Sequence, residues 1–213
     1  MDLTEQILNL VENPHFKTLV EVGAHDDLRS VQLAQHFKQV FCYHEFLKVP
    51  ERQEGNLTVR RVPYLDVLDE LHRYDVVLIE NEFHHFPDIW QMWTYERLGR
   101  YQELLLVEWD MTGNNNYFYS AFQNCAPLCQ LTREIMNRFI SDKKIEIEAA
   151  VKGRYVETIE TRQDLVDYYR YILPDHYPFG EKDFMRRAAG TQYPLELWEG
   201  FDLFKIRRTA PVY

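Results

Sequence analysis

The first 110 residues alternate between strand-like and helix-like segments, and this alternation constrains the fold more than any other feature. The sequence predicts strands at residues 18–22, 40–43, 57–62, 74–79 and 104–107. It predicts helices at residues 2–12, 28–37, 67–71 and 88–99. Most of these strands are apolar throughout, which is typical of a parallel sheet covered by helices on both faces. We therefore expect an α/β fold with a doubly wound, mostly parallel sheet.

The pattern changes after residue 112. A polar, aromatic-rich segment leads into a helical stretch at about 118–140, and residues 145–151 and 154–159 look like two strands around a Lys152-Gly153 hairpin turn. A helix begins near Thr161, and residues 201–208 form a last strand. We expect residues 112–200 to be a cap, with a helical insertion after the fifth strand, inside a single domain spanning residues 1–213.

Charge and composition narrow the range of partners. The chain carries 34 acidic and 24 basic residues, a net charge of −10, and proteins that grip phosphate backbones normally present a basic face. The first ten residues lack the basic start of a signal peptide, and no apolar run approaches the ~20 residues of a membrane span. We expect a cytoplasmic protein without nucleic-acid or membrane partners, acting on a small molecule or contacting another protein, with a homodimer left open.

The cysteines are few and give no metal pattern. Cys125 and Cys129 are spaced CxxxC, and Cys42 stands apart. A sequence-readable metal site needs a further cysteine pair or suitably spaced histidines. We interpret the three thiols as structural and expect no metal.

Two motifs resemble class I S-adenosylmethionine-dependent methyltransferases. TLVEVGAHDD at residues 18–27 is similar to the first motif of that family, and YDVVLIENEFHHFPD at residues 74–88 is similar to its fourth-strand motif. The resemblance covers residues 18–110 in order and spacing. It implies a Rossmann-like methyltransferase fold, S-adenosylmethionine as cofactor, and a site at the carboxyl ends of the strands, in residues 21–27, 43–46, 64–66, 79–85 and 108–112.

The resemblance also implies roles for individual residues. Glu21, Gly23 and Ala24 belong to the loop under the amino-acid part of the cofactor, although His25 and Asp27 stand where the family has glycines. The family has a carboxylate at the end of the second strand that accepts hydrogen bonds from the two ribose hydroxyls. His44 stands at that position by spacing, whereas Glu45, one residue later, is the carboxylate, so either residue is a candidate. Asp66 would contact the adenine amino group, and Glu80 would contact the backbone of the cofactor.

The implied reaction is displacement of the sulfonium methyl group by an aligned nucleophile, and a base is needed only for an acceptor that arrives protonated. The titratable candidates near the strand ends are Glu80, His84 and Asp110. Aromatic residues of the second half are candidates for lining an acceptor pocket, namely Trp109, Tyr117, Tyr119, Tyr168, Tyr169 and Tyr171. The leading hypothesis is methyl transfer to a small-molecule acceptor.

Two alternatives remain open. The chain could keep the methyltransferase fold without using the cofactor, and serve as a binding or partner protein. Strand-end histidines and carboxylates could instead form a zinc or iron site, since these are ligands that such metals accept. The residues of that set are His25, His44, Glu45, Glu80 and His84.

Overall fold

The computed structural model describes residues 2–23, 27–45, 48–173 and 182–209. Contacts divide the chain into two compact units. The first unit consists of Met1–Glu108, Leu128–Gly153 and Asp202–Tyr213, and the second of Trp109–Pro127 and Arg154–Phe201. The predicted sheet belongs mainly to the first unit.

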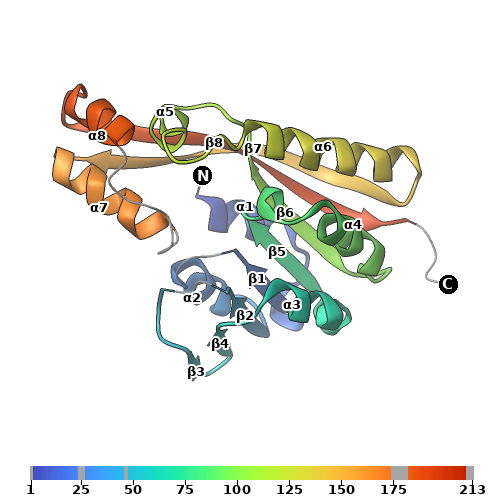
Figure 1. The fold of residues 1–213 in the computed structure, drawn as a ribbon. Helices are drawn as coiled ribbons and strands as arrows, with labels where there is room; N and C mark the ends of the chain where they lie inside the picture. Colours follow the sequence, from blue (N-terminus) through green and yellow to red (C-terminus); the bar gives the residue numbers. More distant parts are fainter. Residues whose placement is uncertain (1, 24–26, 46–47, 174–181, 210–213) are drawn as a thin grey trace. The chain divides into compact units, whose positions relative to one another are not determined.

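The described strands form one eight-stranded sheet in the order β3-β4-β2-β1-β5-β6-β8-β7 (Figure 1). Pairing is parallel between β1 and β2, β1 and β5, β2 and β4, and β5 and β6, and antiparallel between β3 and β4. The α/β prediction with a mostly parallel sheet is confirmed. The strands are β1 (Thr18–Val22), β2 (Gln39–Tyr43), β3 (Arg52–Glu54), β4 (Leu57–Arg60), β5 (Val76–Glu80), β6 (Glu103–Trp109), β7 (Ile145–Ile159) and β8 (Leu195–Arg208).

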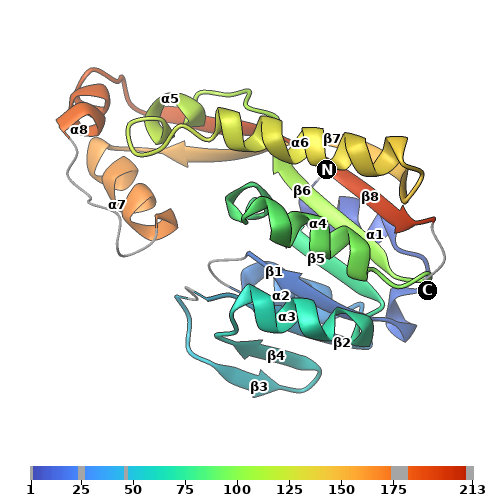
Figure 2. The same ribbon diagram turned by 45° about the vertical axis from the view of Figure 1, so that its right-hand side comes forward.

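Helices cover both faces of this sheet, which explains why its central strands β1, β5 and β6 are mostly apolar and buried. One face packs against α3 (Tyr64–Glu70), α4 (Asp88–Arg97) and α6 (Ala126–Ser141), whose residues share a core cluster with β1, β5 and β6. The opposite face carries α1 (Leu3–Leu10) and α2 (Leu28–Ala34), as Figures 1 and 2 show. The described connections also contain three short 3-10 helices, η1 (Pro14–Phe16), η2 (Leu71–Arg73) and η3 (Phe83–His85).

The chain order places a switch point between β1 and β5. From β1 the chain continues outward through β2 to the edge strand β3, returns through β4, which lies between β3 and β2, and then builds β5 and β6 on the other side of β1. In sheets of this kind, ligands bind beyond the carboxyl ends of the strands at the position where the strand order reverses. The carboxyl ends of β1, β2 and β5 are therefore the part of the fold that positions a site.

The second unit contains α5 (Asn115–Tyr119), α7 (Arg162–Ile172) and α8 (Lys182–Ala189). Its core is aromatic: Tyr169 lies 5.0 Å from Phe184 and 6.3 Å from Phe118 between ring centroids. Tyr169 also donates hydrogen bonds to the backbone and side-chain oxygens of Asn115. A capping box formed by Thr161 and Asp164 starts α7, which confirms the helix start expected there.

Two predictions for the second half are wrong. β7 is a single strand through Lys152 and Gly153, without the predicted hairpin turn. A neighbour of 14 residues, β8, lies beside it, so the backbone groups of both halves find ladder partners without a reversal. The helix predicted at 118–140 is divided into α5 and α6. Among the described helices, none combines the length and apolar character needed to cross a membrane.

Candidate functional site

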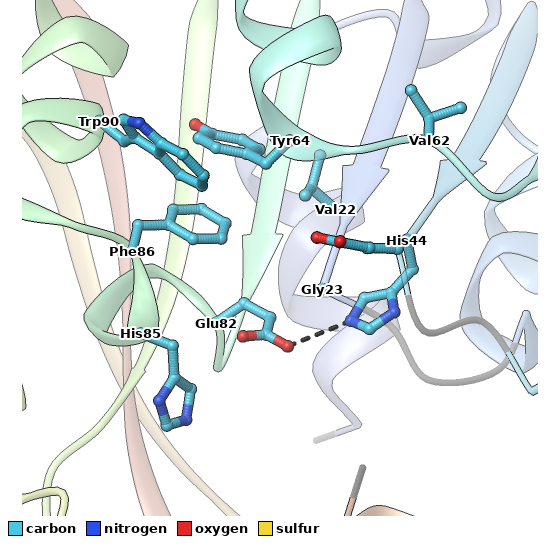
Figure 3. Close-up of a pocket in the computed structure, with 10 residues that line it drawn as sticks. Val22, Gly23, His44, Val62, Tyr64, Glu82, His85, Phe86 and Trp90 are labelled. Carbon is cyan, nitrogen blue, oxygen red and sulfur yellow. Dashed lines mark hydrogen bonds and ion pairs between the residues drawn. The ribbon is translucent and has the colours of Figure 1, made fainter. Parts of the chain in front are cut away.

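A pocket lies at the switch point of the sheet, within the first unit (Figure 3). Its walls come from the ends of β1 and β2, the start of α3, and the segment that runs from β5 into α4. These positions agree with the strand-end segments predicted from the sequence at 21–27, 43–46, 64–66 and 79–85. The lining residues are Val22, Gly23, His44, Glu45, Val62, Tyr64, Glu82, His85, Phe86 and Trp90.

One wall of the pocket is aromatic. The rings of Tyr64 and Phe86 are stacked, with centroids 3.9 Å apart and 17° between their planes, and Trp90 lies 6.2 Å from Phe86 (Figure 3). The Tyr64 hydroxyl donates to Thr94 Oγ1 at 2.7 Å, since Thr94 already donates its own proton to the Trp90 carbonyl. Burial raises the pKa of Tyr64, so the phenol stays neutral. Aromatic side chains of this kind can pack against a planar ring.

The opposite wall is polar and acidic. Figure 3 shows the Glu82 carboxylate pointing toward His44, whose Nε2 donates to Glu82 Oε1 at 3.1 Å. Glu45, at the end of β2, supplies a second carboxylate, and His85 a second imidazole. No lysine or arginine is among the described residues that line the pocket. The lining therefore favours a cationic ligand over a phosphate.

Gly23 allows the strand ends to approach closely. Its φ is +101°, and a Cβ there would lie 2.6 Å from the Glu80 carbonyl oxygen and 2.7 Å from Glu82 Cγ. Only glycine combines that backbone conformation with the missing side chain. Asn81, with φ +51°, turns the chain directly after β5 and leads it into Glu82. The loop after β5 thus lies against the end of β1.

Glu21 and Glu80 lie outside the pocket lining, in a buried charge network. Ser30 Oγ donates to the Glu21 carboxylate, and Arg29 Nε lies 3.8 Å from it. Arg29 also donates twice to Glu80, from Nε to Oε2 at 2.6 Å and from Nη2 to Oε1 at 2.8 Å. One guanidinium therefore serves two carboxylates that the resemblance assigns to the cofactor.

His84 forms a buried pair with Glu108, at the end of β6. Its Nδ1 lies 2.7 Å from Glu108 Oε2, and its backbone N–H donates to Glu108 Oε1 at 3.2 Å. Both side chains are almost fully buried, in contrast to the exposed His85 beside them. Burial raises the pKa of Tyr95, and the nearby negative charge of Glu108 raises it further. The hydroxyl of Tyr95 therefore lies in the electrostatic field of this pair.

The remaining residues predicted for the site do not line the pocket in the part of the chain that the structure describes. Asp66 is exposed in the first turn of α3 and does not line the pocket. Asp110 belongs to the second unit, where its carboxylate accepts from the backbone N–H and the hydroxyl of Thr112. Ala24 and His25 lie outside the described residues. The structure thus brings Gly23, His44 and Glu45 together.

Several pocket residues escaped the sequence analysis. Glu82 and His85 lie inside the fourth-strand motif, but a motif does not tell which side chains turn toward the sheet. Phe86 and Trp90 were not singled out, although Phe86 directly precedes Pro87, the N-cap residue of α4, and Trp90 lies in the first turn of that helix. For the metal set considered from the sequence, His44, Glu45, Glu80 and His84 form no ligand cluster in the described parts of the chain.

Comparison with known proteins adds the fold relationship. No protein-family model matches the chain, and neither does any curated protein sequence. Among solved structures, a SAM-dependent methyltransferase from Anabaena variabilis ATCC 29413 is similar with a TM-score of 0.58 and 14% identity, covering 97% of this chain and 82% of the other.

Two further structures cover both chains almost completely. A "putative methyltransferase" from Bacillus halodurans C-125 has a TM-score of 0.54 and 12% identity, over 98% of this chain and 99% of the other. The precorrin 8w decarboxylase from Methanobacterium thermoautotrophicum has a TM-score of 0.51 and 8% identity, over 97% and 89%. A fold that carries both activities does not by itself fix the reaction. The chain therefore has the Rossmann-like α/β fold found in SAM-dependent class I methyltransferases.

Proposed function

We propose that the protein is an S-adenosylmethionine-dependent methyltransferase that acts on a small-molecule acceptor. One observation carries the proposal: the switch-point pocket joins an aromatic wall to two carboxylates and, among its described residues, has no lysine or arginine. Dinucleotides and nucleoside phosphates share this position in related sheets but bring negative charge. A sulfonium nucleoside brings an aromatic base, two ribose hydroxyls and positive charge, which match this lining.

Each part of the lining has a role in this proposal. Tyr64, Phe86 and Trp90 would hold the adenine ring by stacking. Glu45 would accept hydrogen bonds from the two ribose hydroxyls, at the strand end where the resemblance places such a carboxylate. His44 would orient Glu82 through their hydrogen bond, and Glu82 would face the positive charge of the ligand.

The cofactor, when bound, supplies a methyl group on a positively charged sulfur. The contribution of the chain is then mainly to bind, align and exclude water. An acceptor that arrives protonated needs a base. Because His84 is buried against Glu108, we propose the exposed His85 of the pocket for that role. A small-molecule acceptor fits the net charge of −10, which disfavours nucleic acid.

Calorimetric titration of the full chain with S-adenosylmethionine and S-adenosylhomocysteine tests the proposal. We expect micromolar binding of both, and Glu45→Ala should weaken each by at least about tenfold, the value of a hydrogen bond to a charged group. Glu12→Ala is the matched control, since this exposed carboxylate just after α1 does not line the pocket. No heat at millimolar ligand would overturn the proposal.

A second candidate function rests on the charge network. Glu21 and Glu80, which the resemblance assigns to the cofactor, are held by Ser30 and Arg29 instead. This arrangement favours a binding or partner protein that keeps the fold without using the cofactor. Absence of binding to both nucleosides, together with a folded chain, would favour this candidate over methyl transfer.

A further inference from the structure

A second cluster of chemically active side chains lies in the first unit, at the end of β6. It combines Glu108, His84 of η3 and Cys129 of α6. Their relative exposures are 3%, 2% and 3%, so all three are core residues. One ligand atom from each lies within 4.8 Å of the other two.

The three donors form a set that selects a particular class of metal. Imidazole nitrogen, carboxylate oxygen and thiolate sulfur are the ligands of zinc, whereas magnesium and calcium take oxygen. Bonds of about 2.0–2.3 Å in a tetrahedral site place ligand atoms about 3–4 Å apart, so shifts of about an ångström close the cluster around an ion. We propose that His84, Glu108 and Cys129 bind one zinc ion, with the fourth position taken by water.

The hydrogen bonds in the cluster already orient the ligands. Glu108 Oε1 accepts from the His84 backbone N–H, which fixes the carboxylate while Oε2 faces the His84 ring. Zinc binding would replace the proton between Nδ1 and Oε2, and this proton and the thiol proton would leave to solvent. The backbone hydrogen bond can remain, because it uses the other carboxylate oxygen.

The hydroxyl of Tyr95, which lies in the field of Glu108, is a separate observation that fits the site. The Tyr95 side chain is 1% exposed, and its hydroxyl has no hydrogen-bond partner among the described residues. A buried hydroxyl without a partner is unfavourable, because it has given up its hydrogen bonds to water. A water bound to zinc beside Glu108 would accept a hydrogen bond from this hydroxyl. The cluster thus offers three ligands and an outer-shell donor.

Cobalt substitution tests the site. The full chain is prepared without a histidine tag, stripped with a chelator and titrated with Co²⁺ and then Zn²⁺. We expect one equivalent of Co²⁺ with a thiolate-to-cobalt charge-transfer absorption that Zn²⁺ abolishes. Cys129→Ser should lose this absorption and weaken Zn²⁺ binding by at least tenfold. Loss of a residue that only orients a metal ligand already costs about tenfold in affinity, and loss of a ligand itself should cost more. Cys42→Ser, a buried cysteine of β2, should retain both.

Two results would overturn the inference: no Co²⁺ or Zn²⁺ binding at micromolar concentration, or an absorption that survives in Cys129→Ser. If Cys129→Ser does not fold, X-ray absorption of the zinc-loaded wild-type chain replaces it, and a shell without sulfur refutes the site. These readouts do not involve S-adenosylmethionine. The zinc inference and the proposed function can therefore fail independently.

Discussion

Arg29 on α2 donates two hydrogen bonds, of 2.6 and 2.8 Å, to the carboxylate of Glu80 at the end of β5. The same guanidinium lies 3.8 Å from Glu21, whose side chain is fully buried. A single cation thus joins the ends of the two central strands of the sheet on either side of the switch point. This arrangement makes the charge balance at the carboxyl edge depend on one side chain.

The first prediction concerns that side chain. Arg29→Ala should destabilise the protein by about 3–5 kcal/mol, because it leaves the carboxylates of Glu21 and Glu80 without their shared cation in a largely buried place. Urea unfolding followed by circular dichroism measures the change. Arg97→Ala is the control: Arg97 pairs with Asp69 at the surface, so its loss should cost no more than about 1 kcal/mol. Equal losses in the two variants would contradict the prediction.

The second prediction separates two glycines that share a positive φ. Gly55→Ala should cost about 1–2 kcal/mol, the strain of a left-handed residue, since nothing lies within 4 Å of the added Cβ. Gly23→Ala should cost about 1–3 kcal/mol more, because the Cβ would meet the backbone oxygen of Glu80. Thermal and urea unfolding of both variants provide the comparison. If Gly23→Ala is no worse than Gly55→Ala, the close approach of β1 and the β5 loop is incorrect.

The sheet could be predicted from the sequence because its signal is local. Val77 and Ile79 in β5 belong to an uninterrupted apolar run, and in β1 a single acidic residue, Glu21, separates the buried Val20 and Val22. Such strands are typical of a sheet covered on both faces. The pocket could be predicted only to the level of segments. Which side chains face the switch point depends on turns such as the left-handed Asn81, and these follow from tertiary packing.

The pairing of charged side chains could not be predicted from the sequence either. Glu21 and Glu80 looked like ligand contacts because they follow the motif, but Arg29, which holds both, lies in a stretch read only as a helix. In β7, Lys152-Gly153 reads as a turn, but the strand continues through both residues beside its neighbour β8. Both outcomes depend on residues distant in sequence.

The third prediction concerns alkaline pH. Burial raises the pKa of Tyr64, so the folded state keeps this proton at a pH where the unfolded chain, with an ordinary pKa near 10, has released it. The folded state then binds more protons than the unfolded state, and stability falls as pH rises above about 10. We expect Tyr64→Phe to reduce that fall by about 1.4 kcal/mol per pH unit. Urea unfolding between pH 9 and 11 measures it, and parallel curves for wild type and variant would refute it.

The last prediction tests the aromatic wall of the pocket. Trp90→Ala should weaken S-adenosylmethionine binding by about tenfold, since loss of base stacking on an aromatic side chain costs about 1–3 kcal/mol. Two control variants accompany Trp90→Ala.

Tyr101→Ala removes an aromatic side chain that is 84% exposed and outside the pocket, and should leave the affinity unchanged. Asp66→Ala removes the adenine contact implied by the resemblance; because Asp66 is exposed and does not line the pocket, we expect less than a twofold effect. A larger loss with Asp66→Ala than with Trp90→Ala would move the adenine position from the aromatic wall to the outer face of α3.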